Sequence, residues 1–177
     1  MIILLSLLCS AFFSGMEIAY VSSNRLNLEI EKKQKGLIPK ILSIITKDPS
    51  RFISTMLIGN SFALVIYGLF MGQFIIDYLS FLFSPSMNEL TVLLLQTIIS
   101  TLLILIAAEF IPKVLFQIYS NFSMKIFSIP AYIFYIILYP ITGLVIIISN
   151  FILKTFFKVN TDESEFSFSK VELENYI

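Results

Sequence analysis

Two carboxylates and two neutral oxygen donors stand inside stretches of sequence that are otherwise almost wholly apolar. Glu17 and Glu109 are the only charged residues in their stretches, and Ser14 and Asn60 add a hydroxyl and an amide. An ionisable side chain in the hydrocarbon of a membrane costs about 2.5–3.5 kcal/mol on insertion scales, so it marks a functional site by default. These four residues are therefore the first candidates for a site.

The chemistry of these donors is that of oxygen alone. The chain has no histidine and a single cysteine, Cys9, which excludes a Cys/His zinc site, an internal disulfide and a His-based triad. Pro112 cannot donate to the carbonyl four residues back, so the Ala108 carbonyl becomes a further free oxygen beside Glu109. Oxygen donors suit a hard cation such as Mg²⁺. No nucleophile–base pair or cofactor loop is present in the sequence, so we do not expect an enzyme.

The composition indicates that lipid covers much of the chain. Of its 177 residues 57% are hydrophobic and 14% are charged, and the mean hydropathy is +0.90. A soluble domain of ~150 residues still exposes roughly 30% of its surface, so it could not hide so many apolar side chains. Twelve basic and twelve acidic residues cancel, which leaves no net field to favour nucleic acid.

Four apolar stretches are each long enough for a membrane-spanning helix, which needs about 20 residues. They cover residues 1–21, 52–83, 90–111 and 126–157. Seven of the twelve basic residues lie between the first two stretches, and none lies in the turn 84–89. Because basic loops stay in the cytoplasm, we expect the amino terminus outside and the carboxyl terminus inside.

The candidate donors are expected at a similar depth. Ser14 and Asn60 each lie eight residues from the cytoplasmic end of their stretch, which places both ~12 Å from that boundary. Glu109 lies four residues before Lys113 and is shallower, within reach of a long side chain. Three successive antiparallel helices therefore bring oxygen atoms toward one level.

Simpler interpretations of the same residues remain open. Serine and asparagine in membrane helices often serve only close packing and interhelical hydrogen bonds, which would account for Ser14 and Asn60. Glu17 lies near the inner interface, and its side chain could extend into the headgroups. Asp77 lies near the external end of its stretch, where water would solvate it.

The fourth stretch contains Pro130 and Pro140 and has lysines at both ends. It could cross the membrane fully, or it could re-enter or lie along the inner interface as a broken helix. We favour three full crossings plus one kinked juxtamembrane helix. The predicted fold class is an all-α integral membrane protein.

Three segments resemble the signatures of one family of membrane proteins. Residues 12–17, F-F-S-G-M-E, are similar to the F-F-S-G-x-E motif of the CorB/CorC and CNNM magnesium transporters, which opens their DUF21 membrane domain. Residues 47–60 are similar to the family's K-x-P-x-x-x-I-x-x-x-L-I-G-N segment, and residues 108–113, A-E-F-I-P-K, resemble its G/A-E-x-x-P-K signature. Order and spacing agree across nearly the whole chain.

The resemblance implies three membrane helices with an external amino terminus, a belt-like juxtamembrane helix and a homodimer. It also implies a dehydrated Mg²⁺ held near the inner side of the membrane. On the matching positions the ligands would be Ser14, Asn60 and Glu109, with Glu17 and the carbonyls near Gly15 and Gly59 as contributors. Ser61 departs from the pattern, because many relatives have a second asparagine there.

We therefore expect a DUF21-like membrane domain over residues 1–160, in the plasma membrane of a bacterial haemolysin-like member of this family. Residues 161–177 are expected to begin an acidic cytoplasmic helical region, with a helix capping box at Ser169 and Glu172. Relatives usually continue into a pair of CBS modules, and we expect such a cytoplasmic region in the full-length protein, outside these 177 residues. The expected function is Mg²⁺ or Co²⁺ efflux by alternating access around one site. The alternative is a scaffold or Mg²⁺ sensor that transports nothing.

Overall fold

The computed structural model of the chain describes residues 1–82 and 88–157. Every regular element in these two ranges is a helix, which confirms the predicted all-α fold class. The chain divides into two compact units, Met1–Leu138 and Tyr139–Ile177. The acidic helical region expected over 161–177 lies outside the described residues.

Three helical segments are long and apolar enough to cross a membrane, as the sequence predicted. The first is α1 (Ile2–Ser22), and the second is α4 (Pro49–Leu82). The third runs without a break through α5 (Glu89–Leu103), η1 (Ile104–Phe110) and α6 (Ile111–Ile118). In the most apolar window of this third segment no residue is buried inside the chain, so lipid or another protein surface must cover it.

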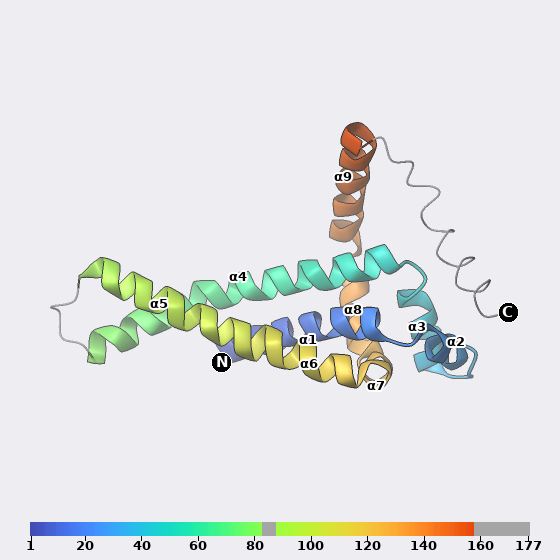
Figure 1. Ribbon diagram of the computed structural model, residues 1–177, viewed down its shortest axis with the longest axis horizontal. Coiled ribbons are helices and arrows are strands. Elements are labelled where there is room, and N and C mark those ends of the chain that lie inside the picture. Colours follow the sequence, from blue (N-terminus) through green and yellow to red (C-terminus); the bar gives the residue numbers. More distant parts are fainter. Residues whose placement is uncertain (83–87, 158–177) are drawn as a thin grey trace. The chain divides into compact units, whose positions relative to one another are not determined.

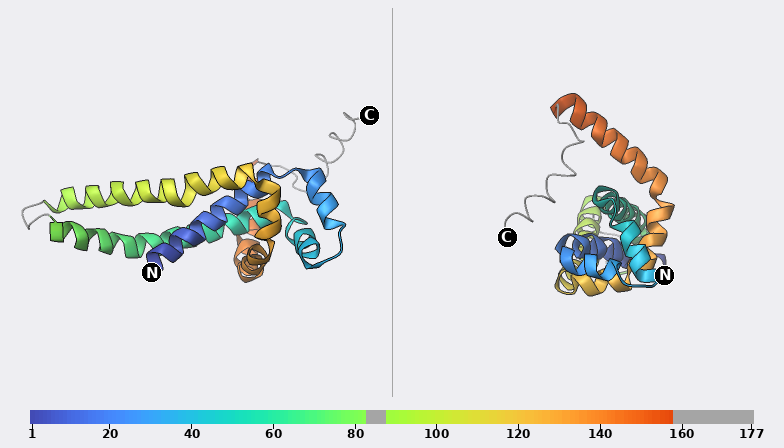
Figure 2. Two further views of the ribbon diagram at one scale, coloured as in Figure 1. Left: turned by 90° about the horizontal axis from the view of Figure 1, so that it is seen from below. Right: turned by 90° about the vertical axis from the view of Figure 1, so that its right-hand side faces the viewer.

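Helix α1 packs against both of the other spans. It contacts α4 along much of its length and contacts η1 and α6 on another side, as Figures 1 and 2 show. The core of this assembly is formed by apolar side chains that include Phe13, Met16, Ala19, Phe52 and Met56. The long α4–α5 pair continues beyond the amino-terminal end of α1 (Figure 2). The polar residues of α1 are consequently enclosed by two neighbours.

The basic loop between α1 and α4 folds into two short helices, α2 (Arg25–Lys32) and α3 (Leu37–Ile45). The Asn24 side chain accepts hydrogen bonds from two backbone N–H groups in the first turn of α2, which caps that helix. Gly36 has a φ of 148°, a conformation that favours glycine and allows the tight connection to α3. An ion pair between Glu31 and Lys125 ties α2 to α7 (Ser120–Ile126).

The fourth apolar stretch is divided into α8 (Ser128–Ile137) and α9 (Tyr139–Phe157), with a break at Leu138. Pro130 and Pro140 lie in the first turns of these two helices, where a missing N–H costs no helical hydrogen bond. The predicted kink is thus a break in the helix, and both prolines begin helices rather than bend them.

Candidate metal site

One face of α1 carries three polar side chains toward its neighbours. Ser10, Ser14 and Glu17 have the spacing i, i+4 and i+7, which aligns them on a single face of the helix. Ser10 and Ser14 are fully buried, and Glu17 is half-buried. The small serine side chains allow the neighbouring helices to approach α1 closely.

Asn60 contacts this face at Ser10. The Ser10 hydroxyl donates a hydrogen bond of 2.6 Å to Asn60 Oδ1, which joins α1 to α4. The sequence analysis missed Ser10, although its position four residues before Ser14 was a usable signal. A carbonyl oxygen has two lone pairs, so Asn60 Oδ1 retains one acceptor site for a cation.

Ser14 lies on α1 between the Ser10–Asn60 hydrogen bond and Glu17, and it takes part in neither interaction. Its hydroxyl is buried and has no hydrogen-bond partner among the described residues. A buried hydroxyl without a partner costs roughly 1–3 kcal/mol, so native proteins rarely leave one unpaired. The Ser14 hydroxyl is therefore available to a ligand, and it is not hydrogen-bonded to Asn60.

Glu17 faces the third span. Its carboxylate is near enough to Glu109 and to Lys113 for their charges to act on it. Glu17, Glu109 and Lys113 thus form a cluster of charges within electrostatic range of one another, although no ion pair joins them among the described residues. In the described part of the chain no three acidic, histidine or cysteine side chains are grouped to hold a metal. A cation here would depend on neutral oxygens as well as carboxylates.

Glu109 lies in a π helix, η1, rather than in a regular α helix. In a π helix each N–H bonds to the carbonyl five residues back, and such turns occur frequently at functional sites. The Ile111 N–H accordingly donates to the Ile106 carbonyl. The sequence analysis predicted a helix disturbed by Pro112 here but had no means to predict the change of register.

The π turn and the proline together leave three carbonyls to share a single helical donor. The Phe110 carbonyl accepts the first hydrogen bond of α6, which begins at Ile111. The bond from the Ile111 N–H and the bond to the Phe110 carbonyl enclose a short gap in the helical hydrogen-bond pattern. Because Pro112 has no N–H, the Lys113 N–H is the one helical donor in this gap. It faces three carbonyls, those of Ala107, Ala108 and Glu109. The sequence analysis expected one free carbonyl, at Ala108, whereas the π register leaves two of these three without a helical donor.

Gly15 and Gly59 are sites of close packing. A Cβ atom at Gly59 would lie 2.4 Å from the Phe13 ring, and one at Gly15 would lie 2.7 Å from the Phe116 ring. The Phe13 ring also packs edge-on against Phe134, with ring centroids 4.7 Å apart. These glycines let aromatic rings lock α1 against α4 and α6, which fixes the positions of the serines between them.

The predicted site residues are thus distributed along α1 rather than gathered at one level. Asn60 lies at Ser10, and Glu109 acts on Glu17, seven residues further along the helix. Ser14 lies between these two contacts. Asp77 is exposed and accepts a hydrogen bond from Gln73, which agrees with its interpretation as a solvated group. As metal ligands, Ser14, Glu17, Asn60 and Glu109 stay predictions.

Three apolar spans enclosing a small set of oxygen donors define this chain as a multi-pass helical membrane protein. Residues 1–177 match the family model described as the cyclin M transmembrane N-terminal domain, CNNM, and the chain belongs to this family. The match extends over the whole length and agrees with the three signature segments. The family is linked to metal transport. A comparison with curated proteins finds no match.

Proposed function

We propose that this chain is the membrane domain of a Mg²⁺ transporter and that Ser14, Glu17, Asn60 and Glu109 form its cation site. The observation that carries the proposal is the buried Ser14 hydroxyl, which has no hydrogen-bond partner within residues 1–82 and 88–157. It lies on the helix face that leads from the Asn60 amide to the Glu17–Glu109 cluster. A cation bound there would satisfy the hydroxyl, and the amide lies on one side of it along this face while the carboxylates lie on the other, so the four residues would have to draw together around the ion.

The charge of the cluster supports a divalent ion. Glu17 and Glu109 together carry two negative charges when ionised, which a single Mg²⁺ would neutralise. Lys113 supplies one positive charge to the same cluster. Because Lys113 cannot balance both carboxylates alone, the cluster without a metal has an excess of negative charge. The donor set contains no nitrogen or sulfur, which disfavours zinc and copper.

The π helix η1 supports a mechanism in which the third span bends to expose the cation site. The surplus carbonyls beside Glu109 weaken the hydrogen-bond ladder of the third span at that point, so the span can bend there at low cost. Such a bend of the third span, with α1 held against α4, would open the site first to one side and then to the other. In this proposal the basic loop faces the cytoplasm, the amino terminus lies outside and the ion leaves the cell.

The uncovered apolar surface of the third span fits the homodimer that the family resemblance implies. A second copy would cover part of this surface, and lipid would cover the rest. The protein would then function in the plasma membrane, with one site in each protomer.

Binding is tested by the Mg²⁺-dependent thermal shift of the purified protein in detergent. Glu109→Gln should abolish the shift, because it removes a full charge from the site. Asp77→Asn is the matched control, since Asp77 is an exposed carboxyl outside the cluster, and it should retain the shift. An unchanged shift in Glu109→Gln would overturn the site assignment. Repeating the titration with Co²⁺ reports selectivity.

Transport is tested by Mg²⁺ flux in sealed liposomes containing the reconstituted protein. We expect flux with the wild-type chain and none with Glu109→Gln. A protein that binds Mg²⁺ tightly but moves none across the membrane would instead be a scaffold or sensor. That outcome would support the binding site and contradict the transport function.

A further inference from the structure

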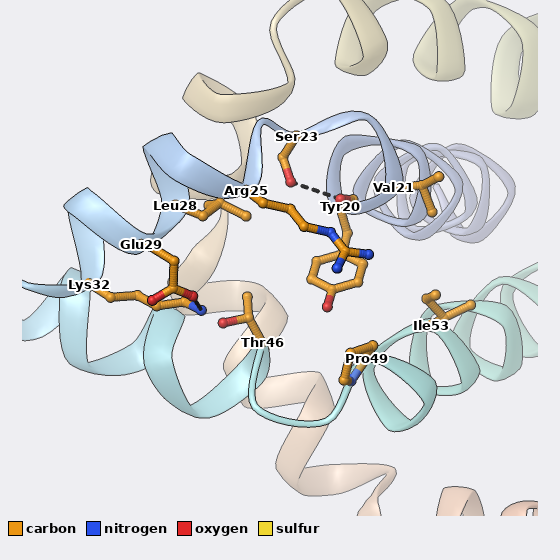
Figure 3. A pocket seen from close by; sticks show the side chains of 10 residues that line it. All are labelled: Tyr20, Val21, Ser23, Arg25, Leu28, Glu29, Lys32, Thr46, Pro49 and Ile53. Atoms are coloured by element: carbon orange, nitrogen blue, oxygen red, sulfur yellow. Dashed lines mark hydrogen bonds and ion pairs between the residues drawn. The ribbon is translucent and has the colours of Figure 1, made fainter. Parts of the chain in front are cut away.

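A cavity of about 380 Å³ lies where α1 ends and α4 begins, beneath α2 (Figure 3). Its wall includes Tyr20 and Val21 from the last turns of α1, and Ile53 from the second turn of α4. Arg25 and Lys32 from α2 close the opposite side. No residue of the candidate metal site lines this cavity.

The polar side of the cavity carries a net positive charge. The Arg25 guanidinium projects into the space and toward the Tyr20 ring (Figure 3), and its charge acts on that phenol. Among the described residues Arg25 forms no ion pair. The Lys32 side chain is 19% exposed and pairs with Glu29 at 2.6 Å. Glu29 neutralises Lys32, so the charged groups of the lining sum to one positive charge. Arg25 carries that charge and is free to bind an anion.

The rest of the lining is mainly aliphatic, because the hydroxyls of Ser23 and Thr46, which also line the cavity, donate to backbone carbonyls. Val21, Leu28, Pro49 and Ile53 line the cavity, and Val21 is 63% exposed. The occupant that matches this lining is therefore amphipathic, with an anionic group at Arg25 and hydrocarbon against the aliphatic side chains. A free inorganic anion would leave the apolar wall in contact with water.

The position of the cavity agrees with this chemistry. α1 and α4 are candidate membrane spans by their length and composition, so their ends at Ser22 and Pro49 are where we expect the hydrocarbon to give way to headgroups. Residues 22–51 at this end hold seven of the twelve basic residues. Basic pockets beside membrane helices are places where phosphate headgroups bind. The cavity thus opens at the depth where lipid phosphates lie.

We infer that this cavity binds the phosphate of an anionic phospholipid from the leaflet on the basic side of the protein. Arg25 receives the phosphate oxygens through its planar fork of donors, and the Tyr20 hydroxyl points into the same space (Figure 3). The acyl chains leave past Val21 into the bilayer. The bound lipid fastens α2 to the ends of two spans, independently of any metal.

The test is a thermal-shift titration of the purified protein with dioctanoyl phosphatidylglycerol, dioctanoyl phosphatidylcholine or inorganic phosphate. We expect a saturable rise in Tm with phosphatidylglycerol and a smaller rise with the zwitterionic lipid. Arg25→Gln should weaken the apparent affinity for phosphatidylglycerol about tenfold or more, the effect of losing one charge-assisted hydrogen bond. Lys33→Gln is the control, because Lys33 is an exposed cation outside the cavity, and its affinity should equal that of the wild type.

Three results would overturn the proposal. Equal losses in Arg25→Gln and Lys33→Gln would mean diffuse attraction to the basic surface. The same shift with inorganic phosphate as with phosphatidylglycerol would make free phosphate the ligand. Val21→Trp provides a second variant that fills the mouth without changing charge. Native mass spectrometry should show retained phospholipid on the wild type but not on Val21→Trp, and equal retention would also contradict the lipid site.

Discussion

The Ser10 hydroxyl donates a hydrogen bond of 2.6 Å to Asn60 Oδ1, whereas the hydroxyl of Ser14, one turn further along the same face, is buried with no partner in the described part of the chain. The two serines have the same burial and the same surroundings of apolar helix, yet only one contributes to holding α1 against α4. Their difference separates a structural serine from one that is available to a ligand.

Substituting each serine by alanine should therefore have opposite consequences. Ser10→Ala should lower the Tm of the metal-free protein, because a buried hydrogen bond worth about 1 kcal/mol is lost and the Asn60 oxygen is left without its partner. Ser14→Ala should leave that Tm equal or higher, since it removes a buried hydroxyl that forms no hydrogen bond with any residue the structure describes. It should nevertheless diminish the Mg²⁺-dependent shift. Ser61→Ala, at an exposed serine, is the control for both.

The measurement is the Tm in detergent with Mg²⁺ and with a chelator. If Ser14→Ala lowers the chelated Tm as much as Ser10→Ala does, the Ser14 hydroxyl has a packing role and the site assignment loses its main support.

The close contact between Gly59 and Phe13 makes Gly59→Ala destabilising. An added Cβ would lie 2.4 Å from the ring, so either the ring must move or α1 must separate from α4, at a cost of about 1–3 kcal/mol. Gly68→Ala is a matched control on the same helix, because its Cβ would meet nothing within 4 Å. It should raise the Tm slightly, since alanine favours helix over glycine by about 0.5–1 kcal/mol.

A double variant, Gly59→Ala with Phe13→Leu, should recover part of the lost stability because the smaller side chain relieves the contact. Additive losses in the double variant would show that the two residues do not interact.

Much of the fold could be predicted from the sequence because each span is marked by composition over about 20 residues. A disturbance of the fourth stretch was also predictable, since Pro130 and Pro140 cannot donate a hydrogen bond to the preceding turn, but its position at Leu138 was not. The sequence did not predict that the basic loop folds into two helices, nor that Glu31 forms an ion pair with Lys125. Both depend on contacts between residues that are far apart in the sequence.

The candidate site was only partly predictable for a related reason. Depth along a helix follows from counting residues, and it placed Ser14 and Asn60 at one level. The side-chain partner of Asn60 depends on how α1 is shifted along α4, and that shift is set by the fit of Phe13 over Gly59. Counting residues cannot reveal such a fit, so Ser10 was overlooked.

The π segment predicts an effect at Pro112. Pro112→Ala supplies an N–H to carbonyls that otherwise compete for one donor, so the segment can return to an α-helical register. We expect Mg²⁺ affinity to fall about tenfold or more, because the free carbonyls are satisfied and Glu109 is turned away from α1. Pro130→Ala, in the first turn of α8, should leave the affinity unchanged. Titration by thermal shift measures both, and equal affinities in the two variants would remove the π segment from the site.

Lys113 provides the sharpest test of the electrostatic cluster. Its ammonium acts on the Glu17 carboxylate and supplies a positive charge to the cluster that also contains Glu109. Lys113→Met should destabilise the metal-free protein, because the carboxylates then repel each other without compensation. The same variant should bind Mg²⁺ about tenfold more tightly, because the ion no longer competes with a tethered cation whose interaction is worth about 1–2 kcal/mol at short range. Lys47→Met removes an exposed lysine from the basic loop and should change neither quantity. Weaker Mg²⁺ binding in Lys113→Met would mean that the lysine supports the site rather than competing with the ion.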